Sequence, residues 1–161
     1  RVEKEYGALA WGEVRQGRRI DAAIGRDPND REKMSARARH ARTAVTRVTR
    51  SRFLRGVSYL HVAIATGRTH QIRVHLSAIG HPIVGDATYG GVRRQMPAHL
   101  RPVQRLERPF LHAMRLSFAH PSEPDRKMEF TTPLPDDLES VLQDIIERLE
   151  HDPGPGSRSP A

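Results

Sequence analysis

Residues 66–91 read TGRTHQIRVHLSAIGHPIVGDATYGG, and this stretch is the most informative part of the chain for the fold. Apolar residues recur within it at helical spacing, at Ile72, Leu76 and Ile79. Gly80 follows them and supplies a C-terminal stop, while Thr69 stands where a capping residue is expected. The pattern therefore predicts a short helix over residues 69–79 that Thr69 caps.

The first turn of this helix would carry several polar side chains. Arg68, His70 and Gln71 would lie beside the free backbone N–H groups, and Arg73 would project from the same end of the helix. A helix N-terminus and a guanidinium group both favour negative charge. The pattern favours a site for a carboxylate or a phosphate, with a surface helix of solvated arginines as the alternative.

The rest of the chain is rich in strand-like segments bounded by Gly, Pro or charged residues. Alternating or β-branched runs predict strands over residues 5–14, 43–48, 58–65, 111–118 and 127–131. A second helix is predicted over residues 136–149 from its apolar stripe, and we expect it to cap the sheet without taking part in chemistry. Together these elements predict an α+β fold, with a mixed, largely antiparallel sheet and flanking helices.

Two segments lack the apolar residues of a core. Residues 27–42 are almost entirely polar and predict a loop, which could order against phosphates or remain a plain solvated loop. Residues 151–161 are rich in Pro, Gly and Ser and predict a disordered tail. One folded domain over residues 1–150 is therefore expected. The chain does not begin with methionine, and we expect its start to be a truncation.

Composition limits the classes of function. The chain carries 27 Lys and Arg against 19 Asp and Glu, and the basic excess lies in residues 1–120. A positive field favours a polyanion such as nucleic acid, although arginine on a merely solvated face would give the same count. Without cysteine there can be no disulfide, thiolate metal site or cysteine nucleophile. No apolar run is long enough to cross a membrane, so the protein should be soluble. The absence of cysteine fits a cytoplasmic location, and we expect a monomer.

GRTHQIRVH followed by GHPIVGDATYG resembles the signature of the RluA family of RNA pseudouridine synthases. Four further segments resemble family segments in the family's order: VEKEYGA at 2–8, IGRDPNDREKM at 24–34, LHAMRLSFAHP at 111–121 and FTTPLPDDL at 130–138. The likeness covers about residues 2–138. It implies part of the pseudouridine synthase catalytic-domain fold.

The resemblance also implies a reaction. A uridine in rRNA or tRNA would lose its N1 glycosidic bond, turn, and rejoin the sugar through C5, with one aspartate as nucleophile and no metal or organic cofactor. Arg73 would pair with that aspartate and keep it ionised, because a nearby positive charge favours the carboxylate. Tyr6 would stack on the target base and is the candidate for proton transfer; an ordinary strand aromatic is the alternative.

The remaining site residues are expected at the RNA. Arg68, His70 and Gln71 would hold the loop or contact RNA phosphate, and Arg31 and Lys33 would contact RNA from the polar segment. The spacing of the histidines does not suit a helical ligand pair, so no metal is expected. A metal-dependent hydrolase built on the histidines is the weakest alternative.

The family's nucleophile belongs to a His-Arg-Leu-Asp-like motif, and nothing resembling that motif occurs in this sequence. Asp21, Asp27 and Asp86 lack its context. We therefore expect the aspartate to lie upstream of Arg1 and the chain alone to be inactive. A non-catalytic RNA-binding module is the alternative to a synthase fragment.

Overall fold

The computed structural model describes residues 2–30, 33–37 and 40–151. Its main element is a six-stranded sheet in the order β2-β5-β6-β1-β7-β8, in which every pairing is antiparallel. The strands are β1 Glu3–Trp11, β2 Arg19–Asp21, β5 Val45–Phe53, β6 Val57–Ile64, β7 Leu111–Ala119 and β8 Lys127–Thr131. The α+β fold with a largely antiparallel sheet is thus confirmed.

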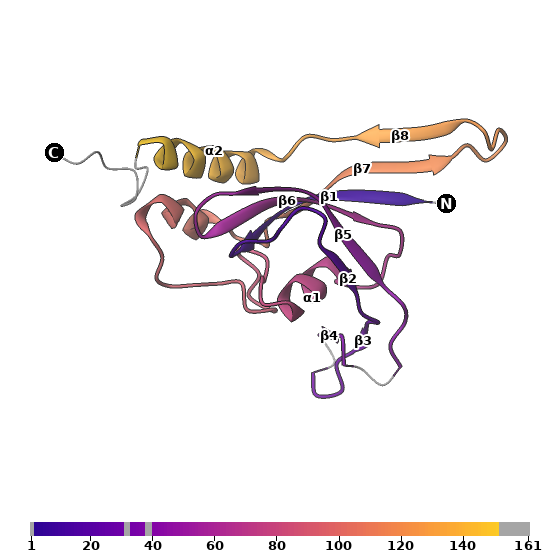
Figure 1. The fold of residues 1–161 in the computed structure, drawn as a ribbon, viewed down its shortest axis with the longest axis horizontal. Helices are drawn as coiled ribbons and strands as arrows, with labels where there is room; N and C mark the ends of the chain where they lie inside the picture. Colours follow the sequence, from indigo (N-terminus) through magenta and orange to yellow (C-terminus); the bar gives the residue numbers. More distant parts are fainter. Residues whose placement is uncertain (1, 31–32, 38–39, 152–161) are drawn as a thin grey trace.

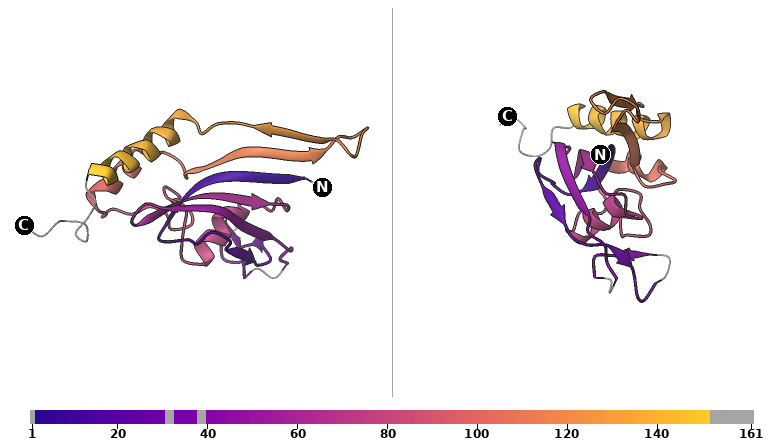
Figure 2. Two further views of the ribbon diagram at one scale, coloured as in Figure 1. Left: turned by 45° about the horizontal axis from the view of Figure 1, so that its top comes forward. Right: turned by 90° about the vertical axis from the view of Figure 1, so that its right-hand side faces the viewer.

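Helices cover both faces of this sheet. They are α1 Gln71–Ala78, the 3-10 helix η1 Ala98–Arg105 and α2 Asp136–His151. Figure 1 shows α1 below the sheet and α2 above it, and both views of Figure 2 agree with this layering. Alternate residues of β1 serve the two layers: Ala8 and Ala10 pack with the α1 side, while Leu9 and Trp11 pack with the α2 side. β1 is therefore the centre of the core.

The apolar stripe of α2 packs where the sequence predicted. Leu138, Val141, Leu142 and Ile145 are buried against the sheet, while acidic residues occupy the first turn. Acidic side chains at a helix N-terminus are favourable because the N-terminal N–H groups carry partial positive charge. The helix runs through His151. The rest of the predicted tail, residues 152–161, lies outside the described residues.

A small hairpin that the sequence did not predict begins just before the polar segment and ends within it. β3 Gly25–Arg26 pairs with β4 Met34–Ser35, and a bridge between Ile24 and Arg42 closes the base of this part of the chain. We call the described residues between Ile24 and Arg42 the excursion. Apolar contacts anchor it, because Met34 and Ile24 pack in a small cluster with Val74 of α1. The excursion is therefore fixed to the helix that carries Arg73.

Among the described residues, no helix is both long enough and apolar enough to cross a membrane.

Candidate active site

Tyr6 and Arg73 line one cavity of about 250 Å³. Tyr6 comes from β1, and Arg73 comes from the first turn of α1. Arg68, His70 and Gln71 line the same cavity. The structure thus brings together five of the seven predicted site residues. Lys33 is not among the lining residues, and Arg31 lies outside the described residues.

A β-bulge lies beside Tyr6. The pairing of β1 with β7 shifts by one residue between Glu5 and Tyr6, because Glu5 pairs with Arg115 and Tyr6 pairs with Ala113. Met114 is the extra residue on β7. Bulges of this kind bend a strand and change the aim of neighbouring side chains, and they are over-represented next to active sites.

The start of α1 differs from the prediction. His70, rather than Thr69, is the N-cap residue, and within the described residues no side chain caps the helix, so the prediction for Thr69 is wrong. His70 has a φ of 55°, in the left-handed region that non-glycine residues seldom adopt. This turn brings the imidazole Nδ1 to 2.7 Å from the hydroxyl of Tyr89. The C-terminal stop is as predicted, with Gly80 at a φ of 84°.

Arg73 forms a two-pronged ion pair with Asp86. Its Nε donates to Oδ2 at 2.8 Å and its Nη2 donates to Oδ1 at 2.9 Å. Asp86 is fully buried, whereas 19% of the Arg73 side chain is exposed. The hydrogen bonds to Asp86 raise the pKa of Arg73 above its ordinary value, although partial burial opposes this. Arg73 therefore remains charged beside the cavity.

Both carboxylate oxygens of Asp86 are already hydrogen-bonded within the protein. Its Oδ1 also accepts the backbone N–H groups of Thr88 and Tyr89, at 3.2 and 3.3 Å. A carboxylate with no exposed surface and these donors cannot approach a substrate atom. Asp86 is thus a structural partner of Arg73 and not a free nucleophile, in keeping with its sequence context.

Tyr89 connects the excursion to Arg73. The backbone N–H of Met34 donates to the Tyr89 hydroxyl at 3.0 Å, and the same hydroxyl shares a hydrogen bond with His70. The guanidinium of Arg73 stacks over the Tyr89 ring, 4.9 Å from its centre. Burial, followed by the nearby charge of Arg73, lowers the pKa of His70. A neutral imidazole is therefore expected at neutral pH.

Gln71 is buried, with only 3% of its surface exposed. Its amide oxygen accepts the Thr66 hydroxyl at 2.7 Å and the Arg68 N–H at 3.3 Å. Its amide nitrogen donates to the carbonyl of Val45 at 2.9 Å and to the hydroxyl of Thr46 at 3.1 Å. Both ends of the amide are satisfied inside the protein. Of its two expected roles, this geometry favours holding the loop.

The Gln71 network continues to His75, which is also fully buried. The Nε2 atom of His75 lies 2.7 Å from the carbonyl oxygen of Ala22, which can only accept, so Nε2 carries the proton. Nδ1 of the neutral ring then accepts from the Thr46 hydroxyl at 2.7 Å. Every donor in this hydrogen-bond network has an acceptor, and the network fixes α1 against β5.

The other predicted RNA contacts lie around the cavity mouth or beside it. Arg68 is partly exposed, and its Nε donates to the carbonyl of Thr43 at 2.9 Å. Lys33 is partly buried. It directly precedes Met34, whose backbone N–H donates to the Tyr89 hydroxyl. In the described part of the chain, no group of three or more His, Asp and Glu lies close enough to hold a metal ion.

Sequence reasoning did not assign two of the contacts at the site. The sequence excluded Asp86 as the nucleophile but assigned neither Asp86 nor Tyr89 a contact with Arg73, because both reach Arg73 only when the loop after α1 closes. It also missed Lys4, which lines the cavity. Lys4 stands two residues before Tyr6 in a strand, and this spacing could have placed it on the same face.

Comparison with known proteins gives one consistent answer. The family described as RNA pseudouridylate synthase matches residues 1–78. The chain is 44% identical over 151 residues to an uncharacterized RNA pseudouridine synthase of Chloroflexus aurantiacus, a match that covers 94% of the chain and 45% of that protein. It is 38% identical over 150 residues to ribosomal large subunit pseudouridine synthase D of Nitrosomonas europaea, covering 93% and 42%. The chain thus spans less than half the length of these two relatives.

Two solved structures share the fold. Human RNA pseudouridylate synthase domain containing 1 has a TM-score of 0.63 at 31% identity, covering 96% of this chain and 68% of that one. Human RNA pseudouridylate synthase domain containing 4 has a TM-score of 0.68 at 24% identity, covering 90% and 62%, and shows likeness of fold alone. The resemblance carried by the sequence motifs is confirmed, and the chain belongs to the RluA-like family of RNA pseudouridylate synthases.

Proposed function

We propose that this chain is the carboxyl-terminal part of the catalytic domain of an enzyme that converts uridine to pseudouridine in ribosomal RNA. The observation that carries the proposal is that Tyr6 and Arg73 line one cavity, with Arg73 fixed by Asp86. Ribosomal RNA is the preferred substrate because a relative that matches nearly the whole chain is named a ribosomal large subunit pseudouridine synthase.

Arg73 has the donors needed to hold a second carboxylate. Asp86 binds the edge formed by Nε and Nη2, and a guanidinium has another edge formed by its two terminal nitrogens. The nucleophilic aspartate would come from the part of the enzyme outside this chain and lie against that edge. There the positive charge would keep the pKa of the aspartate low and the nucleophile ionised. Asp86 is then a positioning residue that acts through Arg73.

Tyr6 would serve the base. In the reaction the bond from C1′ to N1 breaks and a bond from C1′ to C5 forms, so N1 gains a proton while C5 loses one. A phenol ring offers a flat face for stacking and a hydroxyl that can move a proton. Tyr6 lies on the same cavity as Arg73, and the base would occupy the space between them.

The test uses the complete protein, with its native sequence joined upstream of Arg1. Large-subunit ribosomal RNA labelled with tritium at uridine C5 should release tritium, because C5 loses its hydrogen. We expect Arg73→Ala to lower turnover about a hundredfold or more. Arg108→Ala is the matched control. Arg108 binds Asp137 of α2 through the same two atoms, Nε and Nη2, but on the exposed surface of the protein.

Three outcomes would contradict parts of the proposal. Undiminished turnover in Arg73→Ala would remove the role of that residue. Tritium release from transfer RNA but not ribosomal RNA would correct the substrate. No release from either RNA would argue against the activity itself. The 161-residue chain alone should release no tritium, since the nucleophile is absent from it.

A further inference from the structure

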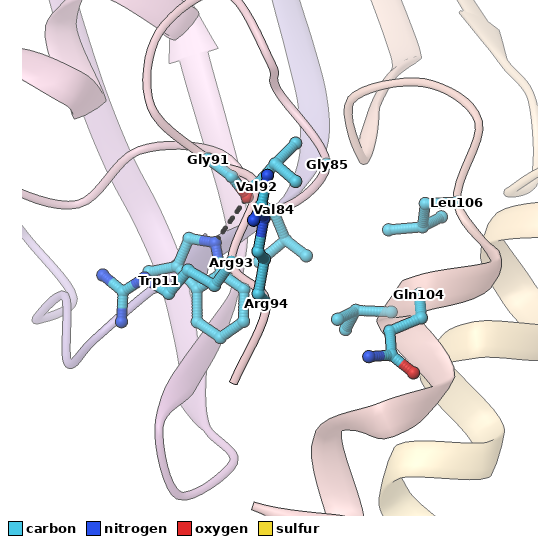
Figure 3. A pocket seen from close by; sticks show the side chains of 10 residues that line it. Trp11, Val84, Gly85, Gly91, Val92, Arg93, Arg94, Gln104 and Leu106 are labelled. Carbon is cyan, nitrogen blue, oxygen red and sulfur yellow. Dashed lines mark hydrogen bonds between the residues drawn. The ribbon is translucent and has the colours of Figure 1, made fainter. Parts of the chain in front are cut away.

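A second cavity, of about 340 Å³, lies between the segment after Gly91 and the end of η1. Its volume is within the range of roughly 300–1,000 Å³ that is typical of ligand sites. Figure 3 shows Gly91 and Arg93 on one side and Gln104 and Leu106 on the other, with a gap between them. None of its lining residues lines the cavity that holds Tyr6 and Arg73.

The interior of this second cavity is apolar and its rim is mostly polar. Val84 and Val103 are at least nine-tenths buried at its base, as is the ring of Trp11. The exposed lining residues are Arg93, Arg94 and Gln104, together with one apolar residue, Val92. A slot with an apolar floor and cationic edges suits a ligand that is flat at one end and anionic at the other.

Trp11 and Arg93 form a fixed pair at one wall. The indole Nε1 donates to the carbonyl oxygen of Gly91 at 2.7 Å, which sets the orientation of the ring (Figure 3). The guanidinium of Arg93 stacks over this ring, 4.5 Å from its centre. Stacking occupies the face of a guanidinium and leaves its N–H donors, which lie in the plane, for an anion.

The arginines around this cavity fall into two groups. Arg105 and Arg108, in or next to η1, pair with Asp144 and Asp137 of α2. Arg93 and Arg94 pair with no carboxylate in the part of the chain that the structure describes. Two guanidinium groups at a cavity mouth without counter-ions favour an anionic ligand. Exposure alone does not explain this, because Arg105 and Arg108 are also exposed and yet are paired.

We propose that this cavity is an accessory nucleotide site, which takes one nucleotide of the bound RNA away from the uridine that is modified. The base enters the slot against the apolar floor, and Gln104 offers its amide donor and acceptor to the edge of the base. The phosphate lies on Arg93 and Arg94. The assignment of the ligand as RNA rests on the proposed function, whereas the shape and charge of the site do not.

The sequence contains a single tryptophan, so the fluorescence of Trp11 reports on this cavity directly. The 161-residue chain is titrated with a short single-stranded oligouridylate carrying a terminal dye. Anisotropy of the dye measures binding, while Trp11 emission measures occupation of the slot. We expect the emission to change over the same concentration range as the anisotropy.

Variants then test whether RNA binds at this cavity or only through the general positive charge of the protein. Arg93→Ala and Arg94→Ala should each weaken binding between about threefold and tenfold and lower the slope of log affinity against log salt by about one. Arg101→Ala is the matched control, because Arg101 is exposed on η1 but does not line the cavity. Arg93→Lys keeps the charge but loses the planar fork, and it should fall between the control and Arg93→Ala.

The proposal is overturned if Trp11 emission stays constant while the anisotropy saturates, or if the Arg93 and Arg94 variants bind like Arg101→Ala. It is overturned equally if the chain binds no oligonucleotide, or if an acidic peptide displaces the RNA and changes Trp11 emission in the same way. None of these results depends on tritium release by the complete protein. Failure of the accessory site and failure of the synthase activity are therefore distinguishable.

Discussion

Two Arg–Asp pairs in this protein have the same geometry and opposite surroundings. Arg73 binds Asp86 through Nε and Nη2 at 2.8 and 2.9 Å, and Arg108 binds Asp137 through the same atoms at 2.9 Å each. The side chains of the first pair are 19% and 0% exposed, whereas those of the second are 42% and 55% exposed. Only the first pair lies at the candidate active site.

The difference shows that burial, and not hydrogen-bond geometry, decides what such a pair does. Water and salt screen the exposed pair, so its partners can separate at little cost. The Arg108 hydrogen bond lowers the pKa of Asp137, so whatever the pair contributes is present above the ordinary aspartate range and is lost on acidification. The buried pair has no such freedom, because removing one partner leaves a charge with poor solvation.

Replacing Asp86 by Asn tests most directly whether burial distinguishes the two pairs. The substitution keeps the shape but removes the charge that faces Arg73, and we expect the free energy of unfolding to fall by about 3 kcal/mol. Urea unfolding measures it. Asp137→Asn is the matched control and should lower the midpoint far less, although Asp137 also lies in the first turn of α2. Equal midpoints for the two variants would show that burial does not distinguish the pairs.

Replacing Gly91 by Ala tests how the loop brings Asp86 to Arg73. A Cβ atom at this position would lie 1.7 Å from the carbonyl oxygen of Ile83, so the backbone must move. Overpacking of this kind should cost about 2 kcal/mol in urea unfolding. At Gly67 the added Cβ meets no atom closer than 4.0 Å, and Gly67→Ala should be tolerated. A stable Gly91→Ala would mean that the loop adapts without loss of the pair.

Acidification extends the comparison to a buried histidine, His75, which forms no direct ion pair among the described residues. Burial lowers the pKa of His75, although its hydrogen bond to Ala22 opposes this. Below about pH 6.5 the unfolded chain takes up a proton that the folded chain resists, so stability present above that pH is lost as the pH falls. One such group contributes at most about 1.4 kcal/mol per pH unit.

The measurement is the free energy of unfolding between neutral pH and about pH 5. His75→Gln should flatten its dependence on pH, whatever its effect on stability at neutral pH. Burial also lowers the pKa of His70, so part of the slope should remain in His75→Gln, but an unchanged slope would show that His75 does not contribute to it.

The smallest expected effect comes from Tyr89→Phe. The ring that carries the Arg73 guanidinium is kept, but the hydroxyl that joins Met34 and His70 is lost. We expect a loss of about 1 kcal/mol, at the low end for two hydrogen bonds because both are only partly buried. Hydrogen exchange of the Met34 amide should become faster, since its acceptor is gone. Unchanged exchange at Met34 would show that the excursion is held by its apolar contacts alone.

Much of the fold could be predicted because long elements carry a clear period. The alternation at 127–131 matches β8 residue for residue, and the stripe at 136–149 gave α2 almost to its end. β2, β3 and β4 are only two or three residues long and depend on their partners, so no local period indicated them. η1 contains an internal proline and was missed for a similar reason.

The candidate site was predictable only in part. The signature around Arg73 is local in sequence and supplied the arginine, and the family resemblance supplied Tyr6. Asp86 and Tyr89 belong to the same signature, but their contacts with Arg73 arise from the tertiary closure of a loop. The buried amide of Gln71 was equally hidden, because its neighbours Val45 and Thr46 belong to a strand earlier in the chain.

The bulge at Met114 makes Tyr6 sensitive to the length of a strand far from it in sequence. With the extra residue, Leu116 pairs with Lys4, and both lie on the face of the sheet that carries Tyr6. Removing the extra residue would make the pairing regular and straighten β7 beside Tyr6, whereas adding a second one would shift every later residue of β7 by one position and to the other face. Substitutions in this strand should therefore be tolerated far better than single-residue insertions or deletions. Homologous enzymes should vary here in composition while keeping its length.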